Sequence, residues 1–544
     1  MVNWKNWSDA AYWQTIKPYY YKVVDGSWNP QVTPSFLTEL LGTPGDDYVT
    51  ENDPVKHNDQ TFYFDARVTY NRTFSDHTIG GLLMYMQREY RSAALPERNQ
   101  GLSGRITYDF KQRYWAEFNF GYNGTERLPR GRRFEFFPAV SLGWVPSNET
   151  WWEPIFETVN YMKLRGSYGL VGSDDTGMSA GAERFLFFDK INIGKGPSYA
   201  TGPSQSQQNW ASGPSIDGFA VENPTWERTR KLDIGIDLSL WNQLNFTFDY
   251  FFEHRYNILL KRGSWPIIMG YWGAVPWSNI GEVDNWGYEL SLNYKKKLFD
   301  DFTIDLRVNF TYTQNKYKNL DEPAYPYVWQ TQTGKPISNT MGYIAEGLFK
   351  DQTDIDNSAF HNLGSNVMPG DIKYRDIDGN NIINENDKVM ISPYGYQPRI
   401  QYGLGLNVTW HKFDFGVFFN GSAKRTIMIN GLSPFGEDNY NMLQIIANDY
   451  WSTSNPNPNA AYPRLGLSNK QTANNNVPST YWMRNGRFIR FKTLEVGWSF
   501  KYGRIYFSGD NLAVWSPFKL WDPELSWNAY PLSRSLNIGI QVNI

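Results

Sequence analysis

Hydrophobic and polar residues alternate along most of the 544-residue chain. Between 302 and 312 every second residue is apolar or aromatic, from Phe302 to Tyr312, and the residues between them are polar, from Thr303 to Thr311. The same pattern occurs in 62–70, 234–240, 244–250, 288–294 and 536–544. A period of two residues is that of a β-strand with one apolar and one polar face. The pattern therefore predicts an all-β protein.

The length of these segments distinguishes between two kinds of all-β protein. They reach about 10 residues or more, against the usual globular strand of roughly 5–6, and such strands can cross a bilayer when tilted. The polar positions carry Asn, Ser, Thr, Gly, Asp and Arg, which suit a hydrated lumen, and aromatics such as Tyr250 and Trp410 gather near strand ends. We therefore predict a transmembrane antiparallel β-barrel. A soluble sandwich or propeller is the alternative, with shorter strands and more Lys and Glu on the polar face.

The connections between strands fall into two classes. Short links are expected at 75–76, 111–112, 241–242, 298–300, 411 and 501–502. Long loops are expected near 172–225, 260–284, 318–398, 423–487 and 512–533. Short periplasmic turns and long extracellular loops are typical of outer-membrane barrels.

The number of strands indicates how much of a barrel is present. About 15 strands run from near Thr61 to Ile544, so 60–544 is predicted to be a partial barrel and 1–59 an extracellular segment. If the last long loop lies outside, the final strand runs inward and the C-terminus is periplasmic. Single-chain bacterial barrels have an even strand number, and residues 1–7 contain no apolar signal-peptide core. We therefore expect the chain to be the later part of a larger barrel in the outer membrane.

Composition excludes several other classes of protein. Aromatic residues make up 17% of the chain, too many for a disordered protein. A net charge of -3 gives no basic surface for nucleic acid. Because there is no cysteine, disulfides, thiolate metal sites and cysteine nucleophiles are all excluded.

Several short motifs occur in the order found in one family of transporters. They include 117–126 (EFNFGYNGTE), 163–169 (KLRGSYG), 279–289 (NIGEVDNWGYE), 342–349 (GYIAEGLF) and 369–376 (PGDIKYRD). Further motifs are 136–144, 223–229, 233–237, 488–492, 508–512, 522–524 and 530–531. Together they resemble the SusC/RagA family of TonB-dependent outer-membrane transporters. The chain departs from many outer-membrane proteins by ending on Ile544 instead of Phe.

The resemblance implies a function and a set of partners. Family members are 22-stranded barrels with an N-terminal plug, paired with a SusD-like surface lipoprotein that acts as a lid. Such pairs import oligosaccharides or peptides, driven by TonB acting on the transporter's N-terminus. We expect nutrient import, with an oligosaccharide favoured over a peptide. TonB is expected to act only through the plug and early strands, which have no counterpart here.

One loop motif has the spacing of a calcium site. Residues 376–387 (DIDGNNIINEND) carry oxygen side chains at places one, three, five, nine and twelve of an EF-hand-like loop. The ligand candidates are Asp376, Asp378, Asn380, Asn384 and Asp387. Asn381 stands where such loops have Gly, and Asp387 is shorter than the usual Glu. A structural calcium ion is one interpretation, and an Asx-rich surface turn without metal is the other. No cofactor is otherwise expected.

Aromatic and charged residues provide the candidates for binding. The loop aromatics that could contact substrate or lid are Trp210, Trp265, Tyr271, Trp272, Trp277, Tyr325, Tyr327 and Trp329. Their rings could stack on sugars or anchor a protein interface, although packing within the loops is favoured for any single ring. The charged residues expected to face the lumen are Asp65, Arg67, Arg105, Asp109, Asp305 and Arg307. These could contact cargo, but ion pairs between wall and plug are favoured.

The sequence gives no sign of an enzyme. The five histidines are scattered without metal spacing, and neither a phosphate-binding loop nor a nucleophile elbow is found. Two alternatives to import remain: a soluble or surface-exposed β-rich carbohydrate-binding protein, and a non-functional gene remnant.

Overall fold

The fold is described from a computed structural model. It describes residues 2–9, 12–13, 20–23, 38–41, 50–51, 55–92, 95–177, 184–194, 198–202, 209–266, 268, 274–430, 444–466, 469–525 and 529–542. Within these ranges, no helix combines the length and the apolar character needed to cross a membrane.

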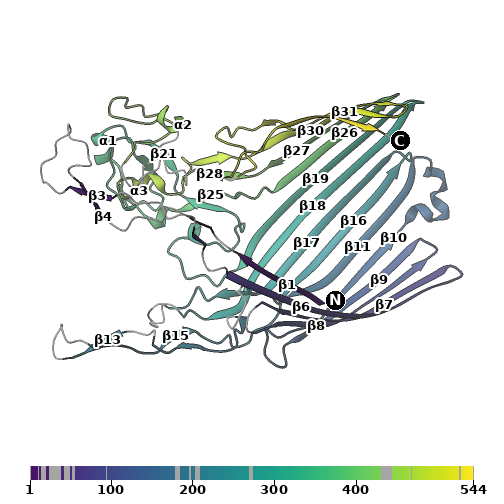
Figure 1. The fold of residues 1–544 in the computed structure, drawn as a ribbon, viewed down its shortest axis with the longest axis horizontal. Coiled ribbons are helices and arrows are strands. Elements are labelled where there is room, and N and C mark those ends of the chain that lie inside the picture. The colour runs from purple at the N-terminus through teal and green to yellow at the C-terminus, as the bar shows by residue number, and fades with distance from the viewer. Residues whose placement is uncertain are drawn as a thin grey trace.

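One large antiparallel sheet of 16 strands forms the body of the molecule (Figure 1). Each strand pairs with its neighbours in the order of the chain, apart from loop strands that do not join the sheet. Its strands, in spatial order, are β1 (Val2–Asp9), β6 (Val55–Phe74), β7 (His77–Arg91), β8 (Glu97–Phe110), β9 (Tyr114–Thr125), β10 (Phe134–Trp144), β11 (Val159–Ser173), β16 (Glu227–Leu240), β17 (Leu244–Lys261), β18 (Trp277–Phe299), β19 (Phe302–Asn319), β26 (Ile400–Trp410), β27 (Phe413–Ala423), β30 (Phe488–Phe500), β31 (Gly503–Trp515) and β32 (Ser535–Val542). The edge strands β1 and β32 each have one neighbour in the described sheet.

The predicted all-β class is confirmed, and the 15 strands from β6 to β32 match the predicted number. The sixteenth strand, β1, corrects the prediction that all of 1–59 lies outside the barrel. Val2 to Asp9 pair with Phe62 back to Val55, so β6 also begins earlier than Thr61. The alternation in 2–9 is too short to predict a strand, because Asn6 and Trp7 interrupt it. Other described parts of this segment form β2 (Tyr12–Trp13) with β5 (Thr50–Glu51) and β3 (Tyr20–Val23) with β4 (Thr38–Leu41).

The two ends of the sheet differ in their connections (Figure 1). At the short-turn end, neighbouring strands are joined by a few residues, several of which adopt the left-handed conformation. Residues with φ between 52° and 55° there are Ser75, Lys111, Gln112, Trp241, Asn242 and His411. The turn predicted at 298–300 lies at 300–301, because β18 extends to Phe299. The connection between β10 and β11 is longer and contains the 3₁₀ helices η2 (Pro146–Asn148) and η3 (Thr150–Ile155), which the alternation does not reveal.

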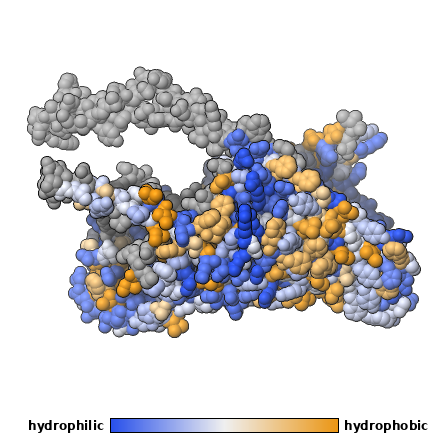
Figure 2. All heavy atoms as spheres, turned by 90° about the horizontal axis from the view of Figure 1, so that it is seen from below, coloured by the Kyte–Doolittle hydropathy of each residue, from blue (hydrophilic) through white to orange (hydrophobic). Residues whose placement is uncertain are grey.

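Alternation gives the sheet an apolar and a polar face. In β19 and β26, Val308 pairs with Leu404 and Asn309 with Gly403, so apolar residues align with apolar ones across strands. The apolar face is exposed along its length: Val68 is 71% exposed and Leu142 is 63% exposed. Figure 2 shows hydrophobic residues gathered beside a hydrophilic stripe on one side of the molecule. A hydrophobic surface of this size on a protein is accounted for by lipid contact.

At the long-loop end, the described residues of three loops pack into one unit, which we call the loop domain: residues 320–398, then 424–430, 444–466 and 469–487, and last 516–525. Its buried core joins residues from all three loops, among them Tyr343, Ile372, Ile427, Trp482 and Phe518. Its elements are η7 (Val328–Gln330), β20 (Thr340–Gly342), β21 (Ala345–Leu348), α1 (Gln352–Asp356), β22 (Phe360–His361), β23 (Ile372–Tyr374), β24 (Ile382–Ile383), η8 (Glu385–Asp387), β25 (Val389–Ser392), β28 (Thr426–Met428), α2 (Gln444–Ala447), α3 (Asn469–Asn476) and β29 (Met483–Asn485).

A second projection follows β11. It contains two small hairpins, β12 (Lys190–Asn192) with β15 (Ser215–Gly218) and β13 (Ser198–Thr201) with β14 (Asn209–Ser212). In Figure 1 this projection extends from the same end of the sheet as the loop domain.

Candidate functional site

The polar face of the sheet carries a hollow of about 730 Å³ across β18, β19, β26, β27, β30 and β31. Its lining includes Arg307, Asn407, Asp414 and Glu495. Glycines at 403, 405 and 416 have no side chains to fill the space here. The polar face can therefore accommodate a hydrated ligand or polypeptide.

An arginine shared by three carboxylates lies elsewhere on this face. Arg165 of β11 contacts Asp249 at 2.6 Å, Asp237 at 3.2 Å and Asp233 at 3.4 Å. These groups meet above Gly235, where a Cβ atom would stand 2.3 Å from Asp249 Oδ1. Glycine is therefore needed to admit the ion pair, which leaves an excess of negative charge on the wall.

The predicted charged residues of the lumen pair mostly within the wall. Asp65 binds Arg67 at 2.9 Å and Asp305 binds Arg307 at 3.0 Å, each across two positions of one strand. Arg105 reaches Glu117 on the adjacent strand at 3.1 Å. The remaining one, Asp109, is 8% exposed and accepts a hydrogen bond from the backbone N–H of Gln112 at the β8–β9 turn.

The predicted loop aromatics do not form one site. Trp210 lies on β14 and is 66% exposed, whereas Trp265 packs near Phe219 with their ring centroids 6.2 Å apart. Trp277 begins β18 beneath Lys261, whose Nζ is 5.4 Å from the ring centroid. Tyr325 is exposed. Tyr271 and Trp272 lie outside the described residues.

Tyr327 and Trp329 pack against the predicted calcium loop. Their rings stack at 4.5 Å with an interplanar angle of 9°. Trp329 Nε1 donates to the Asn386 carbonyl at 2.7 Å. A hydrogen bond with Asp378 raises the pKa of the Tyr327 hydroxyl. These two aromatics therefore support the loop domain instead of facing open solvent.

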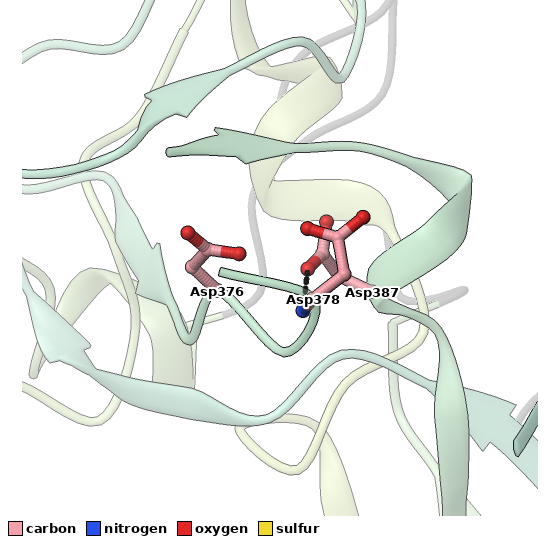
Figure 3. A group of neighbouring side chains, drawn as sticks. All are labelled: Asp376, Asp378 and Asp387. Atoms are coloured by element: carbon pink, nitrogen blue, oxygen red, sulfur yellow. Dashed lines mark hydrogen bonds between the residues drawn. The ribbon is translucent and has the colours of Figure 1, made fainter. Parts of the chain in front are cut away.

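Figure 3 shows the carboxylates of the predicted calcium loop. Asp376, Asp378 and Asp387 each place one carboxylate oxygen within 4.8 Å of the others. Asp387 is fully buried, and its two oxygens accept the backbone N–H groups of Ile377 and Asn384, both at 2.8 Å. Asn381, which stands where such loops have Gly, adopts the left-handed conformation with φ of 62°.

The other two predicted ligands serve the turn. The Asn380 side-chain oxygen accepts the Ile382 N–H at 2.7 Å, and that of Asn384 accepts the Asn386 N–H at 2.8 Å. Burial acts to raise the pKa of Asp376, but N–H groups including those of Asn381 and Gly379 outweigh it and hold the pKa below its usual value. Within the described residues, no basic side chain forms an ion pair with the three aspartates of Figure 3. Three ionised carboxylates at this separation repel one another, and a hard divalent cation would relieve that repulsion.

The loop domain also contains a buried polar network. Asp371 is fully buried and contacts Arg464 Nε at 2.7 Å and Asn475 Nδ2 at 2.7 Å. Burial raises the pKa of Asp371 despite the attraction of Arg464. Nearby, His361 Nδ1 lies 2.7 Å from Asn474 Oδ1, and burial lowers the pKa of this histidine. The network joins the second long loop to the first.

Sequence reasoning missed an arginine that anchors the third loop. Arg490 of β30 is 2% exposed, and its Nη2 donates to both carboxylate oxygens of Asp522. Its Nε donates to Glu524 Oε2 at 3.2 Å. All three residues fall in motifs that carry the family resemblance, but spacing along the chain gives no sign that they pair.

The fold defines a class of protein: a transmembrane antiparallel β-barrel with short turns at one end and long loops at the other. The solved structure of the RagAB peptide transporter matches 90% of this chain with a TM-score of 0.67, at 17% sequence identity. The open sheet does not close on itself within the described residues.

Sequence comparison then shows which proteins of this class the chain is similar to. TonB-dependent receptor P3 of Formosa agariphila is 27% identical over 463 residues, 80% of this chain and 43% of that protein. TonB-dependent receptor SusC of Bacteroides thetaiotaomicron is 26% identical over 468 residues, 81% of this chain and 43% of that protein. The chain is thus similar to receptors of the SusC/RagA type, as its motifs predict, and it spans about half the length of the curated relatives it matches. No family model matches it. The matched proteins are named as receptors and transporters, not enzymes.

Proposed function

We propose that this chain forms barrel wall and extracellular loops of a TonB-dependent importer in the outer membrane. The similarity to SusC over 81% of the chain is the observation that carries this proposal. The polar inner face, with its glycine-lined hollow and wall ion pairs, supports it, because a transport path needs a hydrated lumen. In this arrangement the short-turn end and the C-terminus are periplasmic, and the loop domain is extracellular.

The cargo is a nutrient too large for porins, and we propose an oligosaccharide. A peptide is the second candidate, because a solved structure that shares this fold is that of a peptide transporter. Carbohydrate binding by a soluble protein is less well supported, since the apolar face of the sheet is exposed along its length.

Two kinds of partner follow from this proposal. Further strands and a plug would complete the barrel at the open edges of β1 and β32, since unpaired backbone is costly in lipid. A SusD-like lipoprotein would cover the long-loop end. The projection after β11 offers exposed apolar side chains for that contact, among them Ile191, Ile193, Tyr199 and Trp210.

A structural calcium ion in the loop of Asp376, Asp378 and Asp387 is also part of the proposal. It is supported by the convergence of three carboxylates without a basic partner in the described structure. Its role would be to fix the loop on which Tyr327 and Trp329 pack.

Uptake by cells tests the main proposal. Cells with and without the gene are given fluorescently labelled oligosaccharides and peptides above the porin size limit, with and without a protonophore. We expect at least one labelled polymer to enter only when the gene is present and the proton gradient is intact. Equal uptake of every polymer by both strains would reject import.

A further inference from the structure

A small pocket on the polar face contains an unusual concentration of unsatisfied polar atoms. It has a volume of about 220 Å³ and lies where β26 and β27 meet the loop domain. Three of its lining residues each bury a side-chain atom that has no hydrogen-bond partner: Asn420 Oδ1, Ser422 Oγ and Arg425 Nε. Because buried polar groups are normally paired, their coincidence in one pocket calls for a ligand or ordered water.

Arg425 is the unusual member of this group. Its side chain is 5% exposed, and no carboxylate in the described structure forms an ion pair with it. The guanidinium Cζ instead lies 4.0 Å from the centroid of the Tyr396 ring. A cation–π contact stabilises one face of a guanidinium but does not satisfy its N–H groups. A buried, unpaired cation facing a cavity favours an anion there.

The position of the pocket connects it with the transport path. Gln401 pairs with Ser422 and Gly403 with Asn420, on the same polar face as the hollow described above. The opposite side is formed by Tyr396 and Glu524, and the Tyr396 hydroxyl donates to the Glu524 carbonyl at 3.2 Å. Arg490, which binds Glu524, holds this side in place. A polymer entering between the loops and the wall would pass the opening.

We infer that this pocket, here called the Arg425 pocket, binds a carboxylate group on the imported polymer. The carboxylate would accept hydrogen bonds from Arg425, and an adjacent O–H or N–H group would donate to Asn420 Oδ1. A uronic acid and the C-terminal residue of a peptide both present this combination. The volume is below the roughly 300–1,000 Å³ of pockets for drug-sized ligands, so a single unit of the polymer would enter. This inference rests on the proposed import function and specifies one chemical feature of its cargo.

Ligand binding to the protein purified in detergent from the outer membrane of cells that produce it tests the inference. The probes are D-glucuronate, N-acetyl-L-alanine and neutral D-glucose, measured by saturation-transfer NMR. We expect one or both carboxylates to bind, and Arg425→Met to weaken that binding by about tenfold or more, the loss expected of a charge-assisted pair. Binding of glucuronate alone indicates an acidic sugar, and binding of N-acetyl-L-alanine alone indicates a peptide terminus.

Two further variants keep the result interpretable. Arg487→Met removes an exposed arginine outside the pocket and should leave binding unchanged. If Arg425→Met does not fold, as judged by heat-modifiable migration, Asn420→Asp places a negative charge beside the ligand at nearly constant size and should abolish carboxylate binding. The inference is overturned if neither carboxylate binds, or if binding is the same in the pocket variant and in the unmodified protein, since the pocket then holds only water. Binding is measured without TonB, so loss of uptake with binding intact would count against import and not against the pocket.

Discussion

Arg490 Nη2 lies 2.5 and 2.7 Å from the two carboxylate oxygens of Asp522, and the arginine is almost wholly buried. This ion pair fastens the last long loop to β30. Glu524 adds a second carboxylate at 3.2 Å. The ion pair therefore adds an electrostatic attachment to the packing of Phe518 in the core.

Replacement of that cation should release the loop. Arg490→Met leaves Asp522 without its partner, and breaking a buried pair costs about 3–5 kcal/mol. Hydrogen exchange across 516–525 should accelerate strongly, while exchange in β17 and β18 stays unchanged. Arg487→Met is the matched control, because Arg487 is exposed. Equal exchange in both variants would show that Asp522 does not depend on Arg490.

The two faces of β6 should respond differently to charge. Val68 is 71% exposed on the apolar face, and Thr69 follows it on the polar face. Val68→Arg should cost about 2–4 kcal/mol if this position is near the bilayer midplane, whereas Thr69→Arg should cost little. The two variants are compared by their folded fraction in outer membranes, which is measured by heat-modifiable migration. Similar losses at both positions would contradict lipid contact of the apolar face.

Calcium should stabilise the loop domain. At a concentration a hundredfold above its dissociation constant, a bound ion adds about 2.7 kcal/mol of stability. The stabilisation should be reversed by EDTA and absent in Asp378→Asn, which keeps the shape of the loop but removes one converging charge. The rate of protease cleavage within 320–398 measures this stabilisation. Cleavage that is unaffected by calcium in the unmodified protein would identify the loop as an Asx-rich turn without metal.

Acid should loosen the loop domain through His361. Burial holds the pKa of this histidine below its ordinary value of 6.5, so the opened state binds more protons than the folded state. Its contribution to stability is complete above 6.5 and is lost as the pH falls below that value. Asp371 has the opposite sign, because burial raises the pKa of that carboxyl. Comparison of variants therefore separates the pH dependence due to His361 from that due to Asp371.

The comparison uses His361→Gln, which can still donate to Asn474 but does not titrate. Proteolysis of the loop domain should accelerate between about pH 7.5 and pH 5.5, around the ordinary histidine value, and His361→Gln should reduce that acceleration. His411→Gln alters an exposed histidine at the short-turn end and should leave the acceleration unchanged. An identical pH dependence in all three proteins would exclude His361 as the cause.

The strands of the sheet could be predicted from sequence because each one carries its own signal. A period of two over ten residues separates the faces in segments such as 302–312, and the observed register keeps them separate. Short turns follow, since the chain must reverse between consecutive strands. The strand β1 and the helices of 146–155 give no such signal, because the first is too short and the second interrupts the alternation.

The contacts of the loop domain could not be predicted in the same way. Tyr343 and Trp482 share a core although they are far apart in the chain, and neither lies in a periodic segment. The predicted calcium loop is an intermediate case: spacing predicted five ligands, and the three carboxylates converge while Asn380 and Asn384 cap the turn. Arg425 and Ser422 show no pattern at all, because a pocket between strand and loop depends on tertiary packing.

The common core of Tyr343, Ile427 and Phe518 also limits how the long loops could be exchanged. In many β-proteins a single surface loop can be replaced without disturbing its neighbours. Here a loop transplanted alone would leave two others with exposed apolar side chains and unpaired buried charges. Recombination between relatives should therefore preserve receptors only where all three loops are inherited from one parent, as a single cassette.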